Sequence, residues 1–280
     1  MPNSINTNLS AINTRNKLDK SSKSTKSAME KLSSGKRINS AKDDPAGLAI
    51  ALRFAAQMAG ANQAARNAND GISLVQTADG GLSAVADHLQ RMRELAVQSA
   101  NGTNSDSDRT ALNQEYQQTQ SAIKQTTENT DFNGIKVLND SQSLNLQVGP
   151  NADPSSNQLT VNTSNVQANP DVKAVLTQTD VSTQSNSSDA ISKIDAAIEQ
   201  VSQERARLGA TQNQLSSTVS DLSNSYENTA SARSRIEDAD YAKQTAELTR
   251  SQILNKAGLS ALVHSNTSAS LVAGLLNKHF

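Results

Sequence analysis

The chain has 280 residues and a formal net charge of −1, but only 35% of its residues are hydrophobic and only 2% are aromatic. Typical soluble domains are about 45–50% apolar, so this composition argues against an ordinary globular core. Long helices that each bury one narrow apolar stripe fit it better, because most of their residues stay in water. The balanced charge indicates no general affinity for nucleic acid and is too small to indicate a disordered chain.

The absence of cysteine and of long apolar runs excludes several further classes of protein. The chain has no cysteine, which excludes disulfides, cysteine-based zinc sites and thiol catalysis. It has no run of about 18 apolar residues that could span a membrane. Residues 1–5 lack the basic and apolar segments of a signal peptide, so we expect secretion without one.

The first half of the chain predicts two helices. From residue 46 to about residue 100 there are few helix breakers, and seven positions follow an unbroken 3-4 spacing: Val75, Ala78, Leu82, Val85, Leu89, Met92 and Ala96. This spacing is typical of a coiled-coil seam. Asn101-Gly102 ends the pattern with turn residues. A second helix is predicted from about 107 to 129.

Residues 131–165 change to a period of two, which predicts a small β-hairpin region packed on the helices. Residues 177–188 are rich in Ser, Thr and Gln and show no periodic pattern. We therefore expect a linker there.

The longest periodic pattern runs from Ile191 to Ile236. A helix of that length extends about 70 Å and needs other helices to cover its stripe. The helices predicted at 46–100 and 107–129 are the expected partners. Four polar residues interrupt the stripe and are expected to set the register: Arg205, Gln212, Thr229 and Arg233.

Both chain ends carry apolar residues at helical spacing that neither end can bury alone. Ile5, Leu9 and Ile12 form the stripe at the N-terminal end, and Leu271 and Leu275 continue it at the C-terminal end. We interpret these five residues as a terminal assembly stripe that folds when a partner is present.

The ionisable residues give no catalytic or metal-binding pattern. His88, His264 and His279 do not have the spacing of a metal-binding helix, so we expect no metal, no cofactor and no catalytic residue. The nine basic residues between Arg15 and Lys42 are expected to face solvent or another subunit. The acidic residues at 237–240 are expected to pair with Arg233, Arg235 or a neighbouring subunit.

Several long motifs carry a family resemblance. They are LSSGKRINSAKDDPAGLAIA at 32–51, QAARNANDGISLVQTADGGL at 63–82, LQRMRELAVQSA at 89–100, FNGIKVL at 132–138 and SARSRIEDADYA at 231–242. In this order and at both ends of the chain, they closely resemble the signatures of bacterial flagellins. The tail from His264 to Phe280 follows the family ending only loosely, which leaves its packing and its chaperone contact open.

The resemblance implies a mainly α fold: a long-helix coiled-coil bundle with a small β-hairpin region and with the N- and C-terminal helices paired. Residues 1–44 plus 237–280 would form an inner terminal-helix domain that is disordered in the monomer. Residues 45–236 would form the helical bundle. The gap after the hairpin is short, so the outer inserted domains of many flagellins are expected to be absent.

The resemblance also implies a function and partners. The chain is expected to be a non-enzymatic structural subunit of the extracellular flagellar filament, exported by the flagellar type III apparatus. Its partners would be many copies of itself, an export chaperone, the filament cap protein and the hook–filament junction protein.

A host Toll-like receptor is a further partner implied by the resemblance. Arg91 and Leu95 match residues that contact it in similar flagellins, and the same two residues could instead serve packing between protofilaments. A glutamate that assists the receptor contact is expected to be replaced near Ala122, which predicts weakened but not abolished recognition.

Two alternatives remain open at this stage. A hook–filament junction protein resembles flagellin at both ends but with weaker signatures, and the complete motif at 231–242 favours flagellin. A coiled-coil adhesin or secretion translocator would lack the paired terminal signatures.

Overall fold

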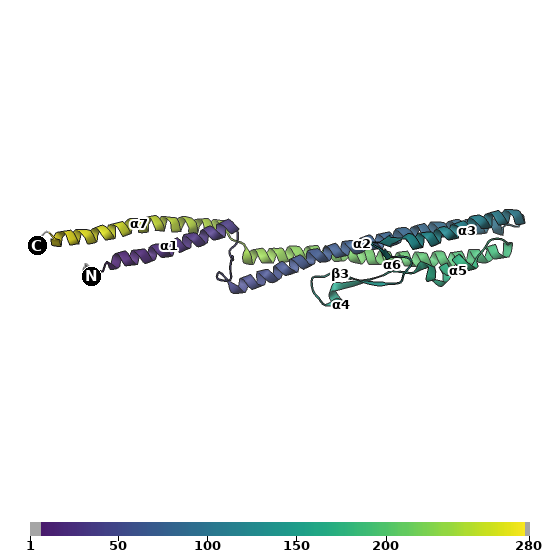
Figure 1. Ribbon diagram of the computed structural model, residues 1–280, viewed down its shortest axis with the longest axis horizontal. Coiled ribbons are helices and arrows are strands. Elements are labelled where there is room, and N and C mark those ends of the chain that lie inside the picture. The colour runs from purple at the N-terminus through teal and green to yellow at the C-terminus, as the bar shows by residue number, and fades with distance from the viewer. Residues whose placement is uncertain (1–6, 278–280) are drawn as a thin grey trace. The chain divides into compact units, whose positions relative to one another are not determined.

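The computed structural model describes residues 7–277 and is built mainly from long helices (Figure 1). In chain order the elements are α1 (Leu9–Ser34), α2 (Pro45–Ala100), α3 (Asp106–Asn129), β1 (Asp131–Phe132), β2 (Ile135–Lys136), β3 (Ser143–Gln147), α4 (Pro154–Asn157), β4 (Gln158–Asn162), η1 (Val166–Ala168), α5 (Pro170–Gln178), α6 (Gln184–Glu237) and α7 (Tyr241–Asn277). The chain divides into two compact units: residues up to 56 together with those from 229 onward, and residues 57–228.

The predicted helices at 46–100, at 107–129 and from Ile191 onward are confirmed as α2, α3 and α6. The linker expected over 177–188 is shorter than predicted, because helix is present on both sides of residues 179–183. The Thr183 hydroxyl accepts a hydrogen bond from the Asn186 backbone N–H at 3.1 Å, as an N-cap does, and α6 starts there. Capping does not depend on apolar periodicity, so the pattern alone missed this helix start.

In the unit formed by residues 57–228, α2, α3 and α6 pack around one hydrophobic cluster. All seven residues of the predicted α2 seam are buried, and α6 contributes Ile194, Ala197, Val201, Leu208 and Leu215. The seam is continuous, so the helices lie alongside one another over most of their length within this unit (Figure 1).

Two ion pairs fix the antiparallel register of α2 and α6. Arg205 Nε lies 2.8 Å from a carboxylate oxygen of Asp79, and Arg93 Nε lies 2.7 Å from one of Asp195. Moving along α2 from Asp79 to Arg93 corresponds to moving backwards along α6, as an antiparallel pair requires. The structure thus places Arg205 in a contact that specifies register, as expected for a polar residue in the seam.

The β region contains two antiparallel hairpins. In the first, β1 and β2 are joined by Asn133 and Gly134, whose φ angles are 49° and 80°. Two positive φ angles define the tight turn that favours Asn-Gly. In the second, β3 pairs with β4 from Ser143↔Asn162 to Gln147↔Gln158, and its apolar side chains join the cluster of the helices.

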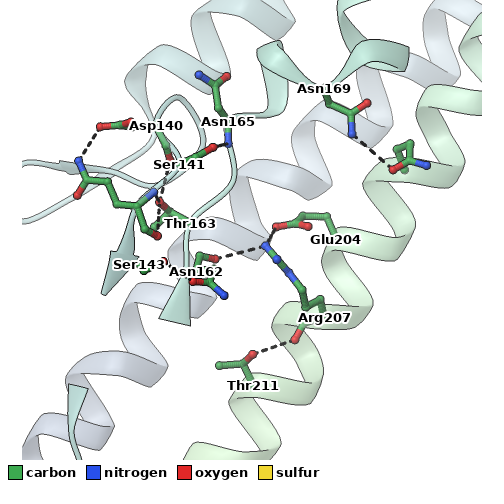
Figure 2. A network of polar contacts seen from close by, with 12 residues as sticks. Asp140, Ser141, Ser143, Asn162, Thr163, Asn165, Asn169, Glu204, Arg207 and Thr211 are labelled. Atoms are coloured by element: carbon green, nitrogen blue, oxygen red, sulfur yellow. Dashed lines mark hydrogen bonds and ion pairs between the residues drawn. The ribbon is translucent and has the colours of Figure 1, made fainter. Parts of the chain in front are cut away.

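Polar contacts hold this second hairpin in place (Figure 2). The Arg207 guanidinium of α6 donates to the Asn162 carbonyl at 3.4 Å and also pairs with Glu204. At the hairpin base, the Thr163 hydroxyl donates to the Asp140 carbonyl at 2.7 Å. The hairpin is therefore attached to α6 by polar groups in addition to its apolar face.

Candidate assembly surface

The terminal unit is built on α1 and α7, which lie side by side (Figure 1). Polar side chains make the contacts between them. The Ser21 hydroxyl donates to the Ser251 carbonyl at 2.8 Å, the Thr25 hydroxyl donates to the Ser251 hydroxyl at 3.0 Å, and the Asn255 amide donates to the Thr25 hydroxyl at 3.0 Å. We call Ser21, Thr25, Ser251 and Asn255 the polar seam.

Small residues allow α1 and α7 to approach closely. Ala28 of α1 and Ser251 of α7 are both 2% exposed. At Gly258, a Cβ atom would lie 3.1 Å from Leu18 Cδ1, which is tighter than ordinary van der Waals contact. The two helices therefore approach through small and polar groups, and Leu18, Leu248 and Leu262 are half-buried on the same two helices.

Many large apolar side chains of α1 and α7 lie on the outside of the pair. Among the described residues, eleven large hydrophobic residues are exposed, and nine of them are on these two helices: Leu9, Ile12, Met29, Tyr241, Ile253, Leu254, Leu259, Val263 and Leu271. Part of this set lines a shallow groove along α7, whose lining residues are Tyr241, Ala242, Thr245, Ala246, Thr249, Arg250, Ile253 and Leu254. We call these nine residues the terminal apolar face.

Three residues of the predicted assembly stripe belong to this face. Leu9, Ile12 and Leu271 are 63%, 46% and 69% exposed. Ile5 lies outside the described residues, and the side chain of Leu275 is likewise outside them. The assembly role of all five residues stays a prediction.

The two sequence signatures at 32–51 and 231–242 meet at a short backbone bridge. The Arg37 N–H donates to the Glu237 carbonyl at 2.7 Å, and the Ala239 N–H donates to the Gly35 carbonyl at 2.9 Å. Gly35 ends α1 with φ 69°, a left-handed conformation that glycine adopts without strain. The bridge joins the end of α1 to the start of α7.

Glu237 is the charged centre of this bridge. Its side chain is 7% exposed and lies 2.5 Å from Lys36 Nζ and 2.7 Å from Arg233 Nε. The hydrogen bond from Lys36, with a further one from Arg233, lowers the pKa of Glu237 although desolvation opposes this. The expected pairing of the acidic residues at 237–240 with Arg233 is confirmed for Glu237.

Arg91 and Leu95 on α2 differ in exposure. The Arg91 side chain is 51% exposed and lies 2.6 Å from Glu115 and 2.8 Å from Glu94, and the hydrogen bond from Glu115, then that from Glu94, raises its pKa. Leu95 is 1% exposed and belongs to the main hydrophobic cluster. Of the two residues that match the receptor contact of similar flagellins, only Arg91 is therefore exposed, and Leu95 packs inside the bundle of α2, α3 and α6.

Sequence reasoning missed the polar seam and the Lys36–Glu237 contact. The signal for the polar seam was present in the Ser-, Thr- and Lys-rich sequence of α1. Nothing local could pair Lys36 with Glu237, which are 201 positions apart. Within residues 7–277, no helix is long and apolar enough to cross a membrane, and no cluster of metal-ligating side chains occurs.

The bundle of long helices and the terminal apolar face define a helical structural protein whose chain ends expose apolar surface. The family model for the bacterial flagellin N-terminal helical region matches residues 5–143, and that for the C-terminal helical region matches residues 191–276. The chain therefore belongs to the bacterial flagellin family and is a structural subunit of the extracellular flagellar filament.

Individual relatives agree with this family. A flagellin of Halalkalibacterium halodurans is 44% identical over 273 residues, covering 97% of this chain and 99% of the relative. The flagellin of Bacillus subtilis strain 168 is 36% identical over 304 residues, covering 97% and 99%. Both are matched almost end to end, which favours flagellin over the hook–filament junction protein.

A solved structure shares the fold. The structure of a candidate flagellar hook-associated protein from Vibrio parahaemolyticus aligns with a TM-score of 0.60 at 15% identity, covering 70% of this chain and all of that one. At this identity the likeness concerns the fold alone.

Proposed function

We propose that the chain polymerises through its terminal helices, which bury the terminal apolar face between neighbouring copies. The carrying observation is that nine of the eleven large hydrophobic residues exposed among the described residues lie on α1 and α7. Each such side chain contributes about 1.5–3 kcal/mol when it is fully buried. Since the polar seam already occupies the contact between α1 and α7, the burial must come from another chain.

The contact between copies is proposed to be heterologous, which means that two different patches meet. A heterologous contact that does not close into a ring produces an open helix, and thus a filament. In this proposal residues 1–44 and 237–280 form the inner layer of the tube and are disordered in the monomer. Residues 45–236 form the layer outside it, and the chain has no catalytic activity.

Seeded polymerisation tests this proposal. Purified full-length chain and a chain lacking the residues before Pro45 and after Ala242 are each mixed with short filament fragments and viewed by negative-stain electron microscopy. We expect only the full-length chain to elongate the fragments. Elongation by the truncated chain would show that the terminal helices are dispensable, and absence of elongation by both would point to a need for the cap protein.

The exposed apolar face also supports the proposed partners before and during assembly. An export chaperone would cover α7, the cap protein would hold arriving subunits, and the junction protein would offer the first copy a matching surface. Export through the flagellar type III apparatus would need no signal peptide. Co-purification of the full chain, but not of a chain ending at Ala242, with a flagellin export chaperone would support the first of these contacts.

A Toll-like receptor contact is proposed through Arg91 and not through direct contact with Leu95. Arg91 is exposed and forms an ion pair with Glu115. Glu115 therefore supplies a carboxylate at this surface, even though the glutamate expected near Ala122 is replaced. Leu95 could reach a receptor or a neighbouring subunit only if the unit opened. A reporter-cell assay with wild-type monomer and Arg91→Ala tests the contact, and equal responses would contradict it.

A further inference from the structure

The chain contains two Asn-Gly pairs, Asn101-Gly102 and Asn133-Gly134. Asn101 and Gly102 are both exposed and lie in the turn between α2 and α3. Asn-Gly is the dipeptide in which a backbone nitrogen reaches the preceding side-chain amide with the least steric hindrance, because glycine has no Cβ. The surroundings of Asn101-Gly102 affect how readily this nitrogen can attack the side-chain amide.

Arg109 of α3 places a cation against the turn. Its side chain is buried, with 6% of the residue exposed, and its guanidinium donates to the carbonyls of Ser99, Asn101 and Asn104. The Asn101 carbonyl accepts this bond at 3.1 Å and accepts a second one from the Asn104 N–H at 3.3 Å. The peptide group between Asn101 and Gly102 is thus polarised by two donors, one of them charged.

These hydrogen bonds favour deprotonation of the Gly102 nitrogen, which is the nucleophile in an attack on the Asn101 side chain. The Asn101 carbonyl and the Gly102 N–H belong to the same peptide group, so donors on the oxygen stabilise the anion formed when the nitrogen loses its proton. The Asn101 side-chain oxygen accepts a hydrogen bond from the Thr103 N–H at 3.3 Å. This donor is placed to stabilise negative charge that develops on that oxygen when its carbon is attacked.

We propose that Asn101 is a covalent modification site, at which the folded turn promotes deamidation to aspartate and isoaspartate. The Gly102 N–H loses its proton to hydroxide, and the nitrogen attacks Cγ of Asn101. The C–N bond of the carboxamide breaks, and the amine takes a proton from water and leaves as ammonia. Water then opens the cyclic imide at either carbonyl, which yields aspartate or isoaspartate without any oxidant or reductant.

Asn133-Gly134 supplies a comparison site within the same chain. It lies at the opposite end of α3, about 36 Å of helix away, in the two-residue turn of the β1–β2 hairpin. Both residues are held at positive φ by strand pairing on either side. Folding should therefore slow deamidation at Asn133 and accelerate it at Asn101.

The experiment follows both sites in the full-length chain by peptide mapping and mass spectrometry that separates aspartate from isoaspartate. Samples are incubated in mildly alkaline buffer, either folded or in concentrated guanidinium chloride. We expect folding to accelerate deamidation at Asn101 by about threefold or more and to slow it at Asn133. Equal or slower reaction at Asn101 in the folded chain would overturn the proposal.

Two variants test the assigned roles. Arg109→Lys keeps the charge but removes the fork of donors, and it should slow the reaction at Asn101 by about threefold with no change at Asn133. Gly102→Ala should slow the reaction at Asn101 by about tenfold or more, because the added methyl group hinders attack by the backbone nitrogen. The fold should tolerate this change, since the added Cβ would lie 3.9 Å from its nearest neighbour, Gln184 Nε2. A rate at Asn101 that is unchanged or raised in Arg109→Lys, with Asn133 unaffected, would contradict the role of Arg109.

Discussion

Arg91 and Leu95 are one helical turn apart on α2, but the free energy that each contributes to folding should differ greatly. Leu95→Ala removes a buried side chain from the main cluster and should lower the free energy of unfolding by about 2–5 kcal/mol. Arg91→Ala removes an exposed ion pair and should cost about 0–1 kcal/mol. Guanidinium chloride unfolding of the monomer, followed by circular dichroism, measures both values.

This comparison also bears on receptor assays. Loss of a receptor response in Leu95→Ala would result from destabilisation of the bundle. The same loss in Arg91→Ala would result from removal of an exposed side chain that contacts the receptor. A small effect of Leu95→Ala on unfolding would show that the bundle does not depend on this side chain, and Leu95 would then be available for contacts between molecules.

Glu237 predicts a pH dependence of assembly. Its folded pKa is lowered, so the ionised form stabilises the bridge at a pH above the ordinary glutamate value, and this contribution is lost as the pH falls through the lowered pKa. At pH 7, Glu237→Gln should cost about 1–3 kcal/mol, because Lys36 and Arg233 lose a charged acceptor. Critical concentrations for polymerisation should therefore rise about five- to 160-fold.

The control for this prediction is the same pair of proteins in acid. The difference between wild type and Glu237→Gln should shrink as the pH falls below the ordinary glutamate value and through the lowered pKa of Glu237, where the wild-type carboxylate takes up its proton. A difference that is constant from pH 7 into this acid range would mean that the ion pairs with Lys36 and Arg233 do not contribute.

The polar seam makes a prediction at the scale of the helix pair. Ser251 is 2% exposed where α1 and α7 approach closely, so Ser251→Leu should force the helices apart and abolish elongation of filament fragments. Ser251→Ala leaves the space free and costs only a hydrogen bond, about 1 kcal/mol, so it should still elongate. Electron microscopy of seeded samples distinguishes the two. Elongation by Ser251→Leu would show that close packing of this pair is not required.

The elements differ in how far the sequence predicted them. The seam of α2 and α6 follows strict 3-4 spacing, apolar throughout in α2 and interrupted by four polar residues in α6, so both helices and their pairing were predicted from it. The hydrogen bonds between α1 and α7 are made by Ser, Thr and Asn side chains, and these produce no apolar periodicity. The start of α6 depends on the hydroxyl of Thr183, which is a local feature that hydrophobic patterns do not report.

At the scale of the molecule, the two units differ in how far they bury their apolar residues. The unit of residues 57–228 buries its apolar seam, while the terminal unit leaves Leu9, Ile12 and Leu271 exposed. Sequence spacing identified these positions in both units and predicted that the chain ends could not bury theirs alone, but it did not show which residues of α1 and α7 face each other. The difference depends on whether a partner helix lies within the same molecule, which only the tertiary structure shows.

This difference makes the last prediction, which concerns Ile253 on the terminal apolar face. Ile253 is 61% exposed, so Ile253→Asp should leave unfolding of the bundle at residues 57–228 unchanged. In the filament the same carboxylate would be buried without a partner, which costs at least about 3 kcal/mol. The critical concentration should rise more than about a hundredfold, and Ile253→Leu, which keeps the apolar surface, should assemble almost as wild type.

The measurement is a sedimentation assay of polymer over a range of subunit concentrations, with monomer unfolding as the control. Because aspartate also lowers helix propensity by about 0.7 kcal/mol, Ile253→Asn serves as a matched variant of similar shape and propensity without the charge. A defect equal in Asp and Asn variants would assign the effect to lost apolar area. Normal assembly of Ile253→Asp would place this side of α7 in water within the filament, and the burial that drives assembly would then lie on the rest of the terminal apolar face.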